Sequence, residues 1–144
     1  MGQGGNYRCN KCGYELNAWT GVGFLYPMVC EENTEKAKKG ELGEKLQKFF
    51  EEHPDGKLDC SKVLLRCEDC GAYDVVLALA MYIPKDGTKP NDAIWDLDGY
   101  KKIGSYKHVC EACGGNMKKV KKESELICPE CGEQLELVDE VMWD

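Results

Sequence analysis

The sequence predicts a small α+β protein in which bound metal supplements a limited hydrophobic core. Three observations lead to this fold class. Eight of the ten cysteines lie in four repeated motifs, short β-prone runs flank those motifs, and one stretch of about 20 residues has helical periodicity. A chain of 144 residues supplies one modest core or two smaller units. Two small units would each need additional stabilisation, which metal ions provide.

The repeated motif is Cys-x-x-Cys-Gly, and we call each copy a knuckle. The knuckles are CNKCG at 9–13, CEDCG at 67–71, CEACG at 110–114 and CPECG at 128–132. Glycine reaches the positive φ of a tight turn without a Cβ clash, and such a turn points backbone N–H groups at the thiolate sulfurs. A redox Cys-x-x-Cys pair has no need of four such copies. The pattern therefore indicates structural sites with four cysteine ligands.

The spacing between knuckles suggests how they pair. Fourteen residues separate Cys113 from Cys128, close to the spacing of a zinc ribbon, a β-hairpin flanked by two knuckles. The third and fourth knuckles are therefore predicted to share one zinc ion. By elimination, the first and second share the other. The predicted ligand sets are Cys9, Cys12, Cys67 and Cys70 for site 1, and Cys110, Cys113, Cys128 and Cys131 for site 2.

An interleaved arrangement is the alternative. RING-like cross-brace domains join the first pair to the third and the second to the fourth, and they usually include a histidine ligand. The two histidines here, His53 and His108, do not stand at ligand spacing in place of a cysteine. The sequential pairing is therefore preferred.

The long gap between the first two knuckles must contain folded structure. Residues 34–53 favour a helix, because Leu42, Leu46, Phe49 and Phe50 recur at helical spacing. Glycines at 40 and 43 predict a break or two shorter helices, since glycine weakens a helix interior. We therefore expect a helical insertion at about 31–54 within the first ribbon.

The remaining segments complete a two-ribbon plan. The apolar run 74–83 predicts a buried strand, and 85–105 is rich in Pro, Gly and Asp, as connecting segments are. We expect residues 1–84 to form ribbon 1, 85–105 to connect, and 106–144 to form ribbon 2. Cys30 and Cys60, outside the knuckles, are expected to be buried like small hydrophobic residues, with an additional metal or redox role as the alternative, and they flank the helical insertion.

Two knuckles carry a family resemblance. The segment YRCNKCGYEL at 7–16 resembles the first knuckle of rubredoxin, and CPECG at 128–132 resembles the second. The wider resemblance is to rubredoxin-like zinc ribbons, which implies antiparallel β-hairpins and ligation by four thiolates. In rubredoxin the two knuckles form one site within a much shorter chain, whereas here two other knuckles lie between them. The resemblance does not carry over electron transport.

Zinc is the expected metal, with two Zn²⁺ ions per chain. Structural four-cysteine sites commonly hold zinc, although tetrahedral sulfur ligation also suits iron, so a rubredoxin-like iron electron-transfer protein is one alternative. Eight thiolates and two divalent ions together change the formal net charge from −7 to about −11. Such a charge disfavours a general polyanion-binding surface.

One basic cluster keeps a nucleic-acid role open. Lys118, Lys119, Lys121 and Lys122 lie at the hairpin predicted for ribbon 2, where they could contact phosphates, while Glu123 and Glu125 follow directly. A solvated hairpin tip is the simpler interpretation of this cluster. A nucleic-acid-associated ribbon related to transcription or translation is thus the first functional alternative, and the iron electron-transfer protein is the second.

Location and activity can also be anticipated. The sequence contains no signal-peptide pattern and no apolar run of spanning length, so a soluble, cytoplasmic protein with reduced thiols or metal thiolates is expected. No arrangement of nucleophile, base and orienting group is visible, and zinc held by four cysteines has no open position for substrate. We therefore expect a non-enzymatic, metal-binding adaptor module whose partner is a protein.

Overall fold

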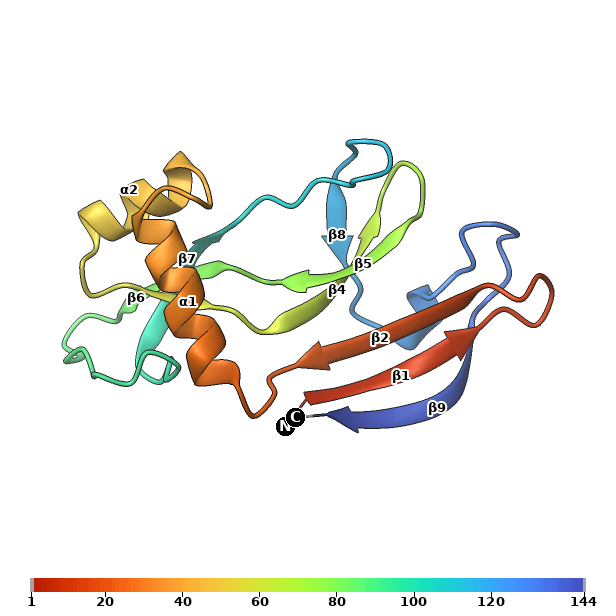
Figure 1. Ribbon diagram of the computed structural model, residues 1–144, viewed down its shortest axis with the longest axis horizontal. Helices are drawn as coiled ribbons and strands as arrows, with labels where there is room; N and C mark the ends of the chain where they lie inside the picture. Colours follow the sequence, from red (N-terminus) through yellow and green to blue (C-terminus); the bar gives the residue numbers. More distant parts are fainter. Residues whose placement is uncertain (1, 144) are drawn as a thin grey trace. The chain divides into compact units, whose positions relative to one another are not determined.

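The structure, a computed structural model, describes residues 2–143 and is an α+β protein with mainly antiparallel sheets (Figure 1). The chain divides into two compact units, and each unit combines segments that are distant in sequence. Unit 1 contains the residues up to 23, residues 62–76 and the residues from 107 onward, and unit 2 contains 24–61 and 77–106. This division differs from the expected ranges: 1–84 is shared between both units, and 85–105 belongs to unit 2 rather than connecting two ribbons.

Unit 1 is built from short strands. Its elements are β1 (Gly2–Arg8), β2 (Glu15–Gly21), β4 (Lys62–Cys67), β5 (Tyr73–Leu77), β8 (Met117–Lys119), the short 3₁₀ helix η1 (Glu123–Glu125) and β9 (Glu136–Trp143). The sheet order is β5-β4-β2-β1-β9, and β8 pairs with β4 beside this path. The pairing of β2 with β4 is limited to Gly21 and Lys62, so the backbone ladder between the two ends of the sheet is narrow.

Glycines in β1 allow close packing of its neighbours. A Cβ on Gly4 would come within 2.3 Å of the Ala18 carbonyl oxygen of β2. The Trp143 ring occupies the space that a side chain on Gly2 would need. The glycine-rich start of the chain is therefore a strand that accepts a large side chain from β9 across its surface.

The core of unit 1 is small and includes ligand cysteines. Alternate residues of β2 point inward, which leaves Leu16 and Ala18 buried and their chain neighbours exposed. The buried cluster consists of Cys9, Leu16, Ala18, Leu64, Leu126, Cys128 and Leu135. Because the cluster contains few aliphatic side chains, burial of apolar surface contributes little to the free energy of folding of unit 1. Units with such small cores usually need an additional source of stability.

Unit 2 packs two helices on a small sheet. Its elements are α1 (Tyr26–Lys38), α2 (Glu44–Glu52), β3 (Lys57–Asp59), β6 (Ala80–Pro84) and β7 (Tyr100–Ser105), and its strand order is β3-β6-β7. The predicted helix break is confirmed, because Gly40 and Gly43 adopt φ of 83° and 101° between the helices. The helix α1 begins earlier than expected, with Pro27 in its first turn, where proline needs no hydrogen-bonding partner.

The apolar run 74–83 forms two strands rather than the single strand predicted. Leu79 adopts a positive φ of 50° between β5 and β6, and this interrupts the extended backbone. A positive φ is strained for a branched side chain, but Leu79 is only 6% exposed and packs in the core of unit 2. Only Leu79, Ala80 and Met81 of this run are buried, whereas the residues of β5 are half-buried or exposed, so the prediction of a buried strand holds for the middle of the run alone.

The core of unit 2 contains the two cysteines outside the knuckles. Leu46, Phe49 and Phe50 of α2 are buried in it, as their spacing predicted. Cys30 of α1 and Cys60 after β3 are both buried in the same cluster, which confirms the expectation that they pack as small hydrophobic residues.

A buried lysine organises the segment between β6 and β7. Lys57 is only 5% exposed, and its ammonium group lies 4.3 Å from the centre of the Tyr100 ring. It donates hydrogen bonds to the Asn91 side chain and to the backbone carbonyls of Ala93 at 2.7 Å and Asp96 at 2.8 Å. The Pro- and Gly-rich segment is therefore held around one cation.

The helices of the protein are short. The longest, α1, has 13 residues, and its exposed face carries lysines and glutamates. Within residues 2–143 no helix has the length and apolar character needed to cross a membrane.

Replacing the buried lysine should destabilise unit 2. We expect Lys57→Met to lower the free energy of unfolding by about 3 kcal/mol, because carbonyls that the ammonium now satisfies would be left without partners. Denaturant unfolding followed by the helical circular dichroism signal measures this change. The control is Lys48→Met on the exposed face of α2, for which we expect a change within about 0.5 kcal/mol. Equal effects of the two substitutions would contradict the assigned role of Lys57.

Candidate metal centres

The four knuckles fold into the same turn. The closing glycines have φ of 80°, 78°, 75° and 77° at positions 13, 71, 114 and 132. Each glycine N–H donates to the carbonyl of the first cysteine of its knuckle, at 2.8 to 3.1 Å. Each first cysteine in turn donates its N–H to a carbonyl five residues later, at 2.7 to 2.9 Å. The predicted requirement for glycine is therefore confirmed in every copy.

Backbone N–H groups point at the sulfur atoms. The N–H groups of Asp69 and Cys70 both donate to the Sγ of Cys67, each at 3.4 Å. Hydrogen bonds of this kind stabilise a thiolate, and the one from Cys70 contributes most to lowering the pKa of Cys67 to about 7. The N–H of Cys12 does the same for Cys9, whose pKa is also lowered to about 7.

The second cysteines of the knuckles behave differently. The N–H of Tyr14 lowers the pKa of Cys12, but the hydrogen bond with Cys128 and burial outweigh it and raise this pKa to about 12. The pKa of Cys113 is raised to about 12 in the same way, against the effect of the Gly115 N–H. Without metal the neighbouring sulfurs thus share protons, which a metal ion has to displace on binding.

The eight sulfurs gather into two sets of four. Centre A consists of Cys9, Cys12, Cys128 and Cys131, and centre B consists of Cys67, Cys70, Cys110 and Cys113. The closest sulfurs across each set are 3.3 and 3.4 Å apart in centre A and 3.4 and 3.6 Å apart in centre B. All four sulfurs of each set lie within 4.8 Å of one another.

These distances fit a tetrahedral metal ion. Zn–S bonds of about 2.3 Å place the corners of a tetrahedron roughly 3.8 Å apart, within the range spanned by the sulfurs of each set. Both sets consist of sulfur alone, the donor type that zinc and iron share in tetrahedral sites. Cys9, Cys12, Cys128 and Cys131 would therefore hold one ion, and Cys67, Cys70, Cys110 and Cys113 a second.

The structure corrects the predicted pairing of the knuckles. The first knuckle joins the fourth and the second joins the third, so the ligand sets predicted as site 1 and site 2 do not form. The interleaved cross-brace alternative does not form either. All eight predicted cysteines nevertheless take part, and neither set contains a histidine.

Strand pairing explains this nested arrangement. The first knuckle connects β1 to β2 and the fourth directly precedes β9, and because β9 pairs with β1 along its length, these knuckles lie side by side. The second knuckle connects β4 to β5 and the third precedes β8, which pairs with β4. Each centre thus combines two kinds of knuckle. One connects the two strands of a hairpin, and the other precedes a third strand that pairs with that hairpin.

The segment between the third and fourth knuckles is not the predicted hairpin. It runs through β8 and η1 and carries the chain from centre B to centre A. Its length resembled a ribbon loop, but its hydrogen bonds go elsewhere: Val120 donates to the Leu64 carbonyl of β4 at 3.0 Å. A better signal was present, since the two knuckles that resemble those of rubredoxin are the first and fourth, which share centre A.

Residues around the centres were missed by sequence reasoning. A Cβ on Gly115 would lie 2.4 Å from the Asp69 carboxylate and 2.9 Å from the Cys67 sulfur, so the second glycine of the CGG sequence makes room for centre B. Glu130, inside the fourth knuckle, lies 3.8 Å from the Cys12 sulfur. In the sequence, the doubled glycine at 114 and 115 was the one signal that a small residue is needed beside centre B.

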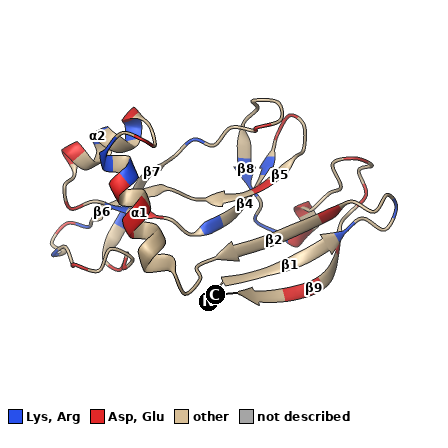
Figure 2. Cartoon of the chain, viewed as in Figure 1, with Lys and Arg blue, Asp and Glu red and all other residues tan. Residues whose placement is uncertain are grey.

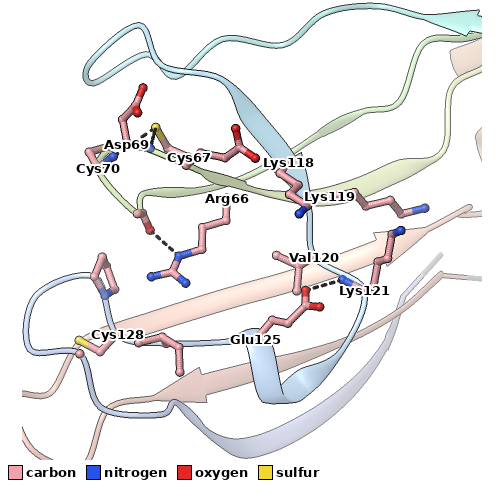
Figure 3. Close-up of a pocket in the computed structure, with 15 residues that line it drawn as sticks. Arg66, Cys67, Asp69, Cys70, Lys118, Lys119, Val120, Lys121, Glu125 and Cys128 are labelled. Atoms are coloured by element: carbon pink, nitrogen blue, oxygen red, sulfur yellow. Dashed lines mark hydrogen bonds between the residues drawn. The ribbon is translucent and has the colours of Figure 1, made fainter.

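An open cleft of about 800 Å³ lies beside the centres within unit 1 (Figure 3). Three of the four lysines of the predicted basic cluster line it, namely Lys118, Lys119 and Lys121, and Arg66 of β4 adds a fourth cation that was not singled out. Arg66 and Lys118 are directly opposite in the β4–β8 ladder, although like charges in that position repel. The Arg66 guanidinium lies 5.3 Å from the Tyr73 ring.

The same cleft also carries negative charge. Glu68, Asp69 and Glu125 line it together with cysteines of both centres. Glu125 accepts a hydrogen bond from the Lys121 backbone N–H at 3.1 Å, as Figure 3 shows. The balance of charges is therefore mixed and not strongly basic.

Comparisons with protein-family models, with curated proteins and with solved structures find no match to this chain.

Removing one knuckle should release the cysteines of its true partner. With Cys9→Ser and Cys12→Ser combined, we expect one metal ion per chain and rapid alkylation of Cys128 and Cys131, because these lose their shared ion. Peptide mapping by mass spectrometry identifies the modified cysteines. The matched variant, Cys67→Ser with Cys70→Ser, should expose Cys110 and Cys113 instead.

The pairing predicted from spacing gives the opposite result. In that case the first variant would leave Cys128 and Cys131 protected and would expose Cys67 and Cys70. Such a labelling pattern would contradict the nested arrangement of the centres.

Proposed function

We propose that this protein is a zinc-binding interaction module in which both four-cysteine centres are structural and the partner is a protein. The observation that carries the proposal is the grouping of eight sulfurs into two sets of four, each within 4.8 Å. Four thiolates complete the coordination of zinc, which leaves no position for a substrate. The centres therefore contribute stability rather than chemistry.

The architecture of unit 1 supports a structural role for metal. Both centres lie in this unit, whose buried cluster has four leucines and one alanine besides its cysteines. The strand β8 has only three residues, and the pairing of β2 with β4 is limited to one residue pair. The ion of centre B would join two segments that a ladder of only three residue pairs holds together, and the ion of centre A would fix the segment before β9 beside the β1–β2 turn, which is how metal stabilises domains with small cores.

The surface of unit 1 supports a protein partner. Leu137, Val138 and Met142 all lie in β9 and are exposed by 41%, 59% and 67%, and the formal charge of the chain is −7 before thiolates are counted. Exposed apolar side chains of this size are typical of protein-binding surfaces. A negative chain repels nucleic acid over long distances.

One observation favours a second candidate function, the binding of nucleic acid through the cleft. Arg66 and three lysines line one concave surface, and no ion pair within residues 2–143 involves them. Cations that are left unpaired and opposite one another are suited to contacting phosphates. The acidic residues in the cleft and the negative charge of thiolate centres oppose this function.

Metal removal should unfold unit 1 and spare unit 2. Native protein is expected to contain two zinc ions per chain by mass spectrometry and to be colourless, whereas ferric iron held by four thiolates is red. A strong chelator should abolish the dispersed amide signals of unit 1, because zinc binding supplies its folding free energy. The helical circular dichroism of α1 and α2 should persist, since unit 2 has a separate core. Retention of all amide signals after complete metal removal would contradict a structural role.

Salt dependence tests the second candidate. If the cleft contacts phosphates, the affinity for a fluorescent single-stranded oligonucleotide should fall steeply with salt, and replacing Lys118, Lys119 and Lys121 by Ser should reduce the slope by about 2. The matched control replaces the exposed Lys39, Lys48 and Lys89 of unit 2. Absent binding at low salt, or equal effects of the two triple variants, would remove the nucleic-acid candidate.

A further inference from the structure

The strand β9 is an open edge of the sheet in unit 1. It pairs with β1 on one side and has no neighbour on the other within the described residues 2–143 (Figure 1). Six of its eight residues are exposed, and among them Leu137, Val138 and Met142 are 41%, 59% and 67% exposed. The register of β9 shifts at Val138, and from Asp139 to Trp143 its outer edge presents a row of unpaired backbone N–H and C=O groups, to which another extended chain can bind.

Its side chains fall on two faces that the register defines. Asp139 and Val141 are opposite Asn6 and Gly4 of β1, so they share the face of Trp19. Glu140 and Met142 are opposite Gly5 and Gln3, on the other face. The sequence Asp-Glu followed by Val-Met thus gives each face one carboxylate beside one apolar side chain.

The two central carboxylates lack compensating charge. Glu136 is opposite Arg8 and accepts a hydrogen bond from Asn10, but no ion pair among residues 2–143 involves Asp139 or Glu140. Figure 2 shows acidic residues on β9 and none that are basic. A second copy of this chain is therefore a poor neighbour, because antiparallel pairing of two β9 strands centred here places like charges opposite each other.

We propose that β9 binds an extended segment of a partner protein, added as a strand, in which two adjacent basic residues are flanked by apolar residues. The basic pair would lie opposite Asp139 and Glu140, with one cation on each face, and the apolar residues would cover Leu137, Val141 and Met142. This inference rests on the proposed function as a protein-interaction module, and it names the surface and the chemistry of the partner.

Titration of a designed peptide tests the proposal. The probe is the capped octapeptide TIVKRIVT, whose basic pair lies between apolar pairs and thus suits either strand direction. Added to the ¹⁵N-labelled protein with both metal ions bound, it should shift the amide signals of 136–143 and of β1. A version methylated on every backbone nitrogen keeps the side chains but cannot donate a backbone hydrogen bond from either edge, so it should fail to bind.

Charge exchange provides the matched controls. The variant Asp139→Lys with Glu140→Lys should bind the probe at least about tenfold more weakly and should bind the acidic peptide TIVEDIVT instead. The control variant, Glu51→Lys with Glu52→Lys at the exposed end of α2, carries the same change of total charge and should bind the probe within about twofold of the unchanged protein.

Several outcomes would overturn the inference. These are no shifts at β9 at millimolar probe, equal binding of the acidic or methylated peptide to the unchanged protein, or dimerisation through β9 in sedimentation analysis. The first would mean that the charges on this edge only prevent unwanted pairing. Because the protein is titrated with two metal ions bound, these results leave the structural metal centres standing, whereas the absence of bound metal would contradict the proposed function itself.

Discussion

The antiparallel pairing of β9 with β1, together with that of β8 with β4, is the constraint on which the rest of unit 1 depends. A four-cysteine centre needs four sulfurs within a few ångströms, and a single knuckle supplies only two of them. Each pairing brings a knuckle from the C-terminal part of the chain beside a hairpin knuckle from the N-terminal part. The ions would in turn fix these strands, so strand pairing and metal binding stabilise one another.

The two units obtain their stability in different ways. Unit 2 has a core of helix and strand residues, including two aromatic rings whose centroids are 4.9 Å apart, and a buried lysine holds its longest loop. Unit 1 has short strands, a small buried cluster and both cysteine centres. The two units thus differ in the size of their apolar cores, and both cysteine centres lie in the unit with the smaller core.

The location of the centres also shapes the surface available for binding. Centre A lies at the knuckle end of the β1–β2 hairpin and just before β9, so the whole length of β9 beyond it remains an exposed edge. Glycines in β1 bring β9 close enough for the Trp143 indole to donate a hydrogen bond to the Thr20 carbonyl of β2 at 3.2 Å. The edge strand β9 thus lies between the cysteines of centre A at one end and the Trp143 ring at the other.

Local features were predicted well from the sequence. Each knuckle carries its own turn information, because the glycine after the second cysteine reaches a positive φ and places N–H groups at the sulfurs. The spacing of Leu46, Phe49 and Phe50 specified the buried face of α2, and Gly40 and Gly43 specified the break before it. These outcomes depend on residues within a few positions of one another, and the sequence shows them directly.

The pairing of the knuckles could not be obtained in the same way. All four have the same ligands and the same turn, so nothing within a knuckle identifies its partner, and the short distance from Cys113 to Cys128 was misleading. The sequence by itself determined that eight cysteines lie in turns suited to binding metal and that the insertion is helical. Only the tertiary structure decided which turns meet, because strand register between residues more than a hundred positions apart places the sulfurs together.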